Sequence, residues 1–183
     1  NVERAESLFI KYNVALDFPW TNERLYAYDL DQREKELGLN TVSVSRGSFM
    51  MGCVPGDGDC NSDESPRHAV TISHEMEVMT TEVTQGLYAS VMGSNPSHFK
   101  GEDRPVETVS WFDAVTFANA LSDTEGLSSC YRINGRDVVW SDLDCTGWRL
   151  PTEAEWEYLA RGGEEHKYSG SDDVGAVAWY GSN

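Results

Sequence analysis

The sequence has no long apolar run and few basic side chains. No stretch approaches the ~20 apolar residues that a membrane-spanning helix needs, so we expect no transmembrane segment. The chain holds 14 Lys and Arg against 31 Asp and Glu, which gives a formal net charge of −17. Because an acidic surface of this size repels phosphate backbones and anionic lipids, we expect no nucleic-acid partner.

Several signatures of chemistry are also missing from the sequence. It contains no C-x-x-C or H-x3-5-H spacing, which argues against a zinc site. It has no phosphate-binding glycine loop and no nucleophile elbow, which argues against nucleotide binding and against a serine hydrolase.

The patterns that are present indicate one globular α+β domain with an extension. A length of 183 residues suits one sizeable core, and six Trp and eight Tyr argue against disorder. Residues 1–40 are interpreted as an N-terminal extension with a short helix over 29–37, and residues 41–183 as the main domain. Short alternating runs predict a hairpin over 41–52, strands over 68–79 and a second hairpin over 131–140.

Three helices are predicted from apolar periodicity and from capping residues. The first covers residues 82–92, and the second begins at Ser110, where Asp113 completes a capping box. The third begins at Thr152, has Glu155 as its capping-box partner and ends at Gly162. A further strand is predicted to begin over 177–180.

The four cysteines fall into two local pairs within loop-like stretches. Three connectivities are open, and we favour Cys53–Cys60 and Cys130–Cys145 because each closes a short polar loop. Two disulfides indicate an oxidising compartment, so we expect an extracellular or periplasmic protein. The alternative is four free thiols.

An acidic loop follows Cys53 and is the candidate for a metal site. Its oxygen-bearing side chains recur at alternate positions, and alternate side chains can converge on one hard cation. The candidate calcium ligands are Asp57, Asp59, Asn61 and Asp63. The loop is not an EF-hand, because Ser62 replaces the glycine and His68 the final glutamate of that motif. The alternative is a solvated acidic loop without an ion.

Six short runs stand in order between residues 47 and 163. They are 47–52 (GSFMMG), 64–70 (ESPRHAV), 82–88 (EVTQGLY), 105–114 (PVETVSWFDA), 148–158 (WRLPTEAEWEY) and 161–163 (RGG). This series resembles the formylglycine-generating-enzyme, or sulfatase-modifying-factor, family of secreted bacterial domains. The resemblance implies a variant of the C-type-lectin-like fold, with little regular secondary structure and often with bound calcium. Members of the family include copper-dependent oxidases that convert a sulfatase cysteine to formylglycine, and iron-dependent sulfoxide synthases.

The residues that match the family motifs are interpreted as structural rather than catalytic. Trp111 and Trp156 are expected to anchor the core, and Arg149 to be buried in an ion pair. The full set of structural motif residues is Trp111, Asp113, Arg149, Pro151, Thr152, Glu153, Glu155 and Trp156. In the oxidases two copper-binding cysteines follow a G-N-x-W-E-W stretch, which this sequence does not contain, so we expect no copper site within it. The family's calcium site is also doubtful, because Trp179 stands where the oxidases have a ligating Asn.

The resemblance and the missing cysteines together favour a non-catalytic binding or structural module. Its partner would be a protein, a peptide or a glycan, or the remaining C-terminal part of its own fold as a separate chain. Two alternatives stay open. One is a copper-dependent oxidase whose catalytic residues lie beyond residue 183, and the other is a calcium-dependent, lectin-like ligand binder.

Overall fold

The computed structural model describes residues 10–12 and 37–178 of the chain. Short strands, short helices and long loops alternate along it, so the fold is α+β, as the sequence predicted. The strands are β1 (Ile10–Tyr12), β2 (Thr41–Val44), β3 (Gly47–Met51), β4 (His68–Ile72), β5 (Met76–Met79), β6 (Tyr131–Asn134) and β7 (Asp137–Trp140). The helices are α2 (Gln85–Met92), α3 (Trp111–Glu125), α4 (Glu153–Arg161) and α5 (Val174–Val177), with 3-10 turns at Ser62–Glu64 and Asp142–Asp144.

The chain divides into two compact units, each built from two stretches of sequence. Unit 1 comprises Asn1–Ser45 and Glu75–Leu150, and unit 2 comprises Arg46–His74 and Pro151–Asn183.

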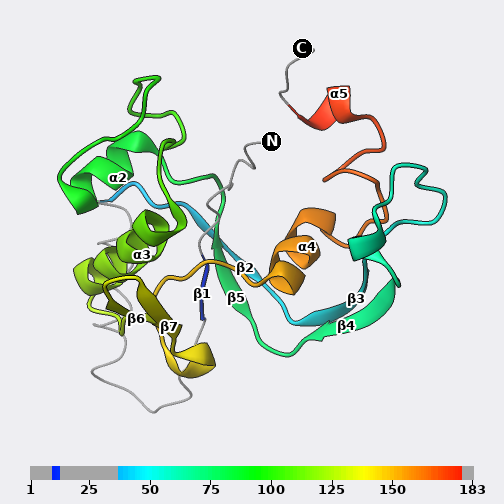
Figure 1. The fold of residues 1–183 in the computed structure, drawn as a ribbon, viewed down its shortest axis with the longest axis horizontal. Helices are drawn as coiled ribbons and strands as arrows, with labels where there is room; N and C mark the ends of the chain where they lie inside the picture. Colours follow the sequence, from blue (N-terminus) through cyan, green and yellow to red (C-terminus); the bar gives the residue numbers. More distant parts are fainter. Residues whose placement is uncertain (1–9, 13–36, 179–183) are drawn as a thin grey trace. The chain divides into compact units, whose positions relative to one another are not determined.

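Unit 1 combines a three-stranded antiparallel sheet with two helices and a hairpin. The sheet has the order β1-β5-β2, with Val78 of β5 paired to Ile10 on one side and to Val42 on the other. Helix α2 packs on α3, and α3 on strand β6 (Figure 1). The core lies among these elements, and its fully buried members include Val115, Leu121 and Trp148.

Unit 2 is a two-stranded hairpin covered by one helix. Strands β3 and β4 pair antiparallel, with Phe49 opposite Val70, and α4 packs on both strands (Figure 1). The helix comes close at Gly47, where an added Cβ would lie 2.4 Å from the hydroxyl oxygen of Tyr158. The Tyr158 ring also packs on Phe49, with ring centroids 5.5 Å apart. Gly47 is therefore required for close packing.

The hairpin predicted over 41–52 is wrong, although both of its strands exist. Strand β2 pairs with β5 in unit 1, whereas β3 pairs with β4 in unit 2. Tight hairpins need residues with positive φ, and Gly47 is not among the positive-φ residues of the chain. The sequence pattern identified the strands, but β2 pairs with residues 32 to 38 positions further along the chain and β3 with residues 17 to 25 positions further along.

The second predicted hairpin is confirmed, with its turn shifted by one residue. Asn134 pairs with Asp137, so the two-residue loop is Gly135-Arg136 rather than Asn134-Gly135. Gly135 has φ 62°, which fits the first central position of a tight hairpin turn.

The helix caps are confirmed at both predicted capping boxes. The Ser110 hydroxyl accepts from the Asp113 amide, and the Thr152 hydroxyl accepts from the Glu155 amide. In return, the Asp113 and Glu155 carboxylates accept from the amides of Ser110 and Thr152. Helix α2 begins three residues later than predicted, because the Thr84 hydroxyl caps it by accepting from the Leu87 amide. A threonine satisfies a first-turn N–H that the chain upstream cannot satisfy.

Two predictions concern the ends of the chain. The helix over 29–37 lies almost wholly outside the described residues, although Gly38 has the left-handed φ of 70° expected at its end. Val177 closes α5 rather than opening a strand, and Ala178 after it is extended. The rest of that predicted strand lies outside the described residues. The extension also contributes β1, which the sequence did not indicate.

The expectation that Trp111 and Trp156 anchor the core is wrong. Their side chains are 51% and 45% exposed, whereas Trp148 is fully buried. Trp111 is the first residue of α3 and Trp156 lies on the outer side of α4. Helical periodicity places apolar residues on a stripe but does not identify which of several tryptophans the core receives.

Candidate functional site

The acidic loop of unit 2 runs from the end of β3 to the start of β4 and is closed by the predicted Cys53–Cys60 disulfide. Its base is narrow, since the Cys53 amide donates to the Glu64 carbonyl at 3.4 Å. Gly52 makes this approach possible. It has φ 104°, and an added Cβ would lie 2.4 Å from the same carbonyl oxygen.

Two of the four predicted calcium ligands, Asp57 and Asp59, form ion pairs with a lysine. The Lys167 ammonium lies 3.1 Å from Asp57 Oδ1 and also donates to Asp59. The Asp59 amide donates to Asp57 Oδ1 at 2.9 Å. This amide, followed by Lys167, lowers the pKa of Asp57. The hydrogen bonds to Asp59 and Asp57 raise the pKa of Lys167, so the ammonium is a fixed cation in the loop.

The other two predicted ligands point elsewhere. The Asn61 side-chain amide donates to Glu64 Oε1 at 3.2 Å. Asp63 lies exposed in the first turn of the 3-10 segment. Among the described residues, the aspartates of this loop do not form a group of converging ligand atoms. The structure thus brings Asp57 and Asp59 together around Lys167, and the calcium prediction stays a prediction.

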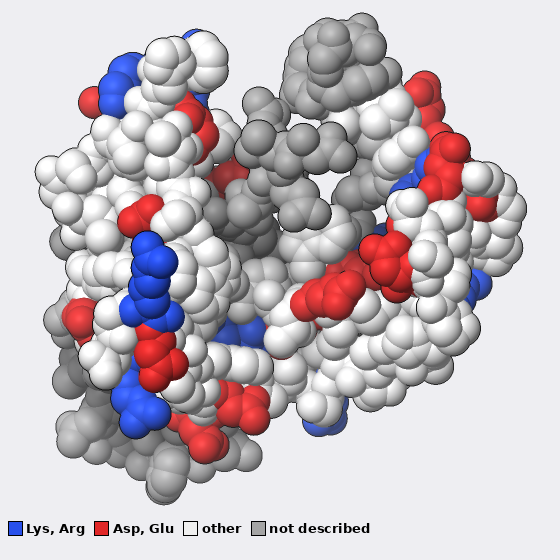
Figure 2. Space-filling model, viewed as in Figure 1, with Lys and Arg blue, Asp and Glu red and all other residues white. Residues whose placement is uncertain are grey.

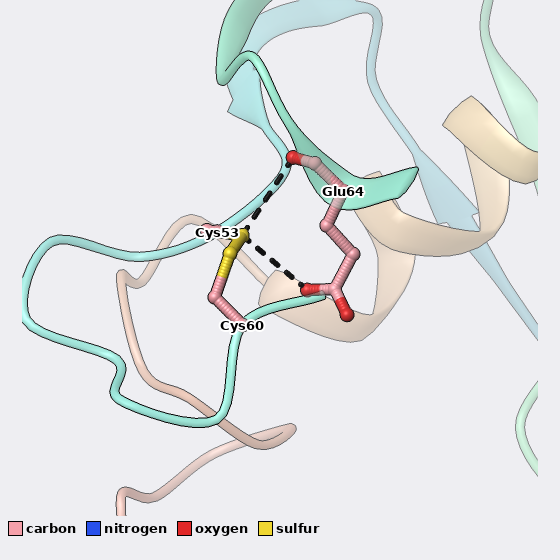
Figure 3. Close-up of side chains that lie close together, drawn as sticks. All are labelled: Cys53, Cys60 and Glu64. Atoms are coloured by element: carbon pink, nitrogen blue, oxygen red, sulfur yellow. Dashed lines mark hydrogen bonds between the residues drawn. A yellow bond between two sulfur atoms is a disulfide. The ribbon is translucent and has the colours of Figure 1, made fainter. Parts of the chain in front are cut away.

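A different group of ligand atoms does converge at the base of the loop. The two sulfurs of the disulfide and a carboxylate oxygen of Glu64 all lie within 4.8 Å of one another (Figure 3). Cys53 Sγ lies 3.7 Å from Glu64 Oε2. Sequence analysis identified the cysteines but not Glu64.

Further contacts attach the loop to the segment that follows α4. Arg67, near the end of the loop, forms an ion pair with Glu165 of that segment, and Lys167 of the segment forms one with Asp59 of the loop. Each side therefore contributes one cation and one anion. At the base of the loop the Gly52 amide donates to Glu157 Oε1 at 2.8 Å, and Arg161 donates to the Gly52 carbonyl. The acidic loop is therefore held at its base and along one side.

Two of the three glutamates of α4 form hydrogen bonds within unit 2. Glu155 is buried, and its Oε2 accepts from the Thr152 amide at 2.8 Å. Its Oε1 lies 2.7 Å from His74 Nε2. Glu157 bonds Arg161 one turn later, while Glu153 lies exposed in the first turn, at the positive end of the helix dipole. These carboxylates cap and brace the helix.

Unit 1 has a polar centre at Gln85, whose role was not predicted. Gln85 is 1% exposed, and its amide donates to the carbonyls of Phe99 and Pro105. Its oxygen accepts from Asn95 Nδ2 at 2.9 Å and from the Gly101 amide at 3.1 Å. All four hydrogen-bonding positions of the amide are filled, so this side chain organises the loop over 93–109.

The second predicted disulfide, Cys130–Cys145, is present in unit 1 and is buried. Arg149 is buried as expected, with its guanidinium carbon 5.2 Å from the centre of the Trp140 ring. Pro151 comes two residues later, where the chain enters α4 in unit 2. At α3, hydrogen bonds from the Ser110 hydroxyl and amide lower the pKa of Asp113. These side chains cap, stack and brace the fold.

The surface agrees with the acidic composition. On the face drawn in Figure 2, acidic side chains are spread over both units, and the described residues form no broad basic patch. No helix in the described parts of the chain is long and apolar enough to cross a membrane.

The chain is similar to one protein family over most of its length. The profile of the sulfatase-modifying factor enzyme 1-like domain matches residues 26–183. The match includes all six of the ordered runs, and it begins within the extension.

Two curated proteins are similar to the chain. The chaperone protein LppX of Paenibacillus barcinonensis is 44% identical over 119 residues, covering 56% of this chain and 42% of that protein. The formylglycine-generating enzyme of Streptomyces coelicolor is 26% identical over 161 residues, covering 73% of this chain and 51% of the enzyme. The chain thus spans about half the length of the curated relatives it matches.

A solved structure shares the fold. Treponema denticola variable protein 1 superposes with a TM-score of 0.68 and 34% sequence identity, covering 79% of this chain and 62% of that one. Its likeness extends the family resemblance from sequence to three dimensions.

Proposed function

The chain belongs to the sulfatase-modifying factor enzyme 1-like domain family, and we propose that it acts as a non-catalytic binding module. The observation that carries the proposal is the state of its sulfur. All four cysteines are paired in two disulfides, so none is a free thiol. Copper(I) in proteins is selected by soft thiolate ligands, and a sulfur in a disulfide is not a thiolate.

The other chemistry-bearing side chains support the same proposal. The buried carboxylate of Glu155 has its oxygens bonded to Thr152 and His74. The Asp113 carboxylate is bonded twice to Ser110. General acid–base catalysis needs a group within reach of a substrate proton, and these groups are instead part of helix caps.

A protein is the partner that the exposed surface favours over a peptide or a glycan. Trp111 and Phe112 at the start of α3 are 51% and 41% exposed, with ring centroids 5.3 Å apart. Trp111 also lies edge-on to Tyr131 at 6.5 Å. Aromatic side chains are enriched in protein interfaces, and one relative is named as a chaperone protein. A separate chain that carries the rest of the family fold is a partner of the same chemistry.

The proposed location is extracellular or periplasmic. Disulfides persist in oxidising compartments and are rare in the cytosol.

The catalytic alternative is supported by the 26% identity to a formylglycine-generating enzyme. It requires copper-binding cysteines outside the sequence printed here. The gene sequence distinguishes the two: two cysteines that follow a G-N-x-W-E-W stretch after residue 183 favour the oxidase, and the same stretch without them favours the module.

One experiment tests the absence of catalysis directly. The chain is incubated with copper(I), oxygen and a sulfatase-motif peptide that contains cysteine, beside an authentic formylglycine-generating enzyme. We expect no peptide aldehyde by mass spectrometry from this chain. Aldehyde formed in several turnovers would overturn the proposal.

A second experiment tests protein binding. The chain is added to a chemically denatured model protein during dilution, and aggregation is followed by light scattering. We expect suppression by the native chain and a loss of suppression in the Trp111→Ala, Phe112→Ala double variant. Trp156→Ala is the matched control, since it removes an equally exposed tryptophan from unit 2. Equal activity of the two variants would contradict a role for the α3 surface.

A further inference from the structure

We propose that the Cys53–Cys60 disulfide is a reducible clasp which, once opened, forms a binding site for a thiophilic divalent cation of the zinc class, with Glu64 as the third ligand. The inference does not depend on the proposed function. It rests on the arrangement of Cys53, Cys60 and Glu64 at the base of the acidic loop (Figure 3).

The distance from sulfur to carboxylate oxygen fits such an ion, and the two sulfurs would move apart once their bond is broken. Tetrahedral zinc has Zn–S distances of about 2.3 Å and Zn–O distances of about 2.0 Å, which place sulfur and oxygen ligands about 3.5 Å apart. Cys53 Sγ lies 3.7 Å from Glu64 Oε2. The Ser65 hydroxyl lies 3.7 Å from each sulfur, so a fourth, oxygen ligand is at hand.

The carboxylate is oriented by a neighbour that does not belong to the ligand group. Asn61 Nδ2 donates to Glu64 Oε1 at 3.2 Å, which leaves Oε2 facing Cys53. Metal sites in proteins use outer hydrogen bonds of this kind to fix their ligands. Asn61 would thus be a positioning residue of the site rather than a ligand.

The loop is held by contacts that do not pass through the sulfur–sulfur bond. Gly52 bonds Glu157 and Arg161 through its amide and carbonyl. Lys167 binds Asp57 and Asp59 along the side of the loop. Because none of these contacts involves the sulfur–sulfur bond, we expect them to survive reduction and to keep both thiols within reach of one cation.

The two disulfides differ in access to a reductant. Cys53 and Cys60 are partly exposed, whereas Cys130 is fully buried and Cys145 is 4% exposed. Thiol–disulfide exchange depends on access to the sulfur. A mild reductant should therefore open Cys53–Cys60 first.

Opening the Cys53–Cys60 disulfide requires a two-electron reductant. A dithiol transfers two electrons and two protons to the disulfide, giving two cysteine thiols and a cyclic disulfide. Each thiol then releases its proton as its sulfur binds the cation, since the thiolate is the ligand. In the oxidised protein the sulfurs are bonded to each other, and we expect no uptake.

The test uses the full chain, reduced under native conditions with a phosphine that competes weakly for metal. Alkylation and peptide mapping then identify which cysteines are free, and circular dichroism records the fold. We expect Cys53 and Cys60 to be alkylated while the fold is retained. Loss of the fold on opening this disulfide alone would overturn the proposal, because the loop contacts would not have held.

The reduced chain is then titrated with cadmium or zinc, followed by the thiolate-to-cadmium absorption band and by native mass spectrometry. We expect one ion per reduced chain and none per oxidised chain. Glu64→Gln should weaken binding at least ~10-fold. Asp63→Asn is the matched control, since it removes one negative charge from the same loop outside the ligand group. No uptake by the reduced chain, equal affinities of these two variants, or uptake by a Cys53→Ser, Cys60→Ser double variant would each refute the site.

Discussion

Lys167 lies 3.1 Å from the carboxylate of Asp57, so the acidic loop already contains a cation. The loop resembles a calcium loop in sequence because oxygen-bearing side chains stand at alternate positions. In the structure the Lys167 ammonium, from the segment after α4, neutralises part of its negative charge. Calcium binding at Asp57 and Asp59 therefore has to displace Lys167, which is the basis of the first prediction.

Removing the lysine should strengthen any binding of calcium to the acidic loop. Lys167→Met keeps the length of the side chain and frees two carboxylates, which are the ligands that calcium prefers. We expect isothermal calorimetry to show tighter calcium binding in this variant than in the native chain. Glu165→Gln, in the same segment, serves as control, and an equal response of all three proteins would contradict competition at the loop.

The pKa of Asp57 gives a pH-dependent version of the same contact. The Asp59 amide and Lys167 lower this pKa from its ordinary value of about 3.8. The ionised carboxylate thus stabilises the folded loop fully above the unfolded pKa, and this stabilisation is lost as the pH falls through the lower, folded pKa. In Lys167→Met the pKa should move up towards the ordinary value, as measured by carbon-13 NMR titration. An unchanged titration would show that the Asp59 amide alone is responsible.

Gly52 should tolerate no side chain. An added Cβ would lie 2.4 Å from the Glu64 carbonyl oxygen, and φ 104° disfavours L-residues. We expect Gly52→Ala to lower the free energy of unfolding by roughly 2–4 kcal/mol, because backbone strain and a backbone clash add. Gly58→Ala is the control in the same loop, since its Cβ meets nothing within 4 Å and its φ is not positive. Thermal denaturation of the two variants compares them directly, and equal losses would be inconsistent with this geometry.

The buried amide of Gln85 should not be replaceable by its isosteric carboxylate. Glu accepts at both oxygens, so the carbonyls of Phe99 and Pro105 would lose their donor. An ionised group would also be buried in place of a neutral one. We expect Gln85→Glu to cost about 2–4 kcal/mol in urea denaturation at pH 7, with partial recovery at low pH, where the acid regains a donor. Glu82→Gln, an exposed exchange just before α2, should cost little by comparison.

These sites differ in how far the sequence alone could predict them. Both capping boxes were predicted because Ser110 and Thr152 bond residues three positions away, within one helical turn. The disulfide pairings were predicted for a similar reason, since each closes a short loop. Local contacts of this kind are encoded in a few adjacent residues.

The long-range contacts could not be predicted in the same way. Lys167 meets Asp59 from 108 positions away, and nothing in the polar segment around Lys167 marks it as a partner. Strand β2 likewise pairs with β5 rather than with the adjacent β3, and the alternating pattern does not distinguish these two partners. An alternating pattern shows which face of a strand is buried but not which strand it pairs with. In the same way, an apolar residue type does not show that Trp148 rather than Trp111 is buried in the core.

The cap of α4 gives a last prediction, in which the test variant and its control differ by the hydroxyl group that forms the cap. The Thr152 hydroxyl accepts from the Glu155 amide and donates to its carboxylate, so it satisfies the helix start and orients the buried Glu155. Thr152→Ala should lower the free energy of unfolding by about 1 kcal/mol, the usual effect of losing an N-cap. Thr152→Ser keeps the hydroxyl and should retain most of that stability. Urea denaturation followed by circular dichroism measures both, and if serine proves as harmful as alanine, packing of the threonine methyl rather than the cap stabilises α4.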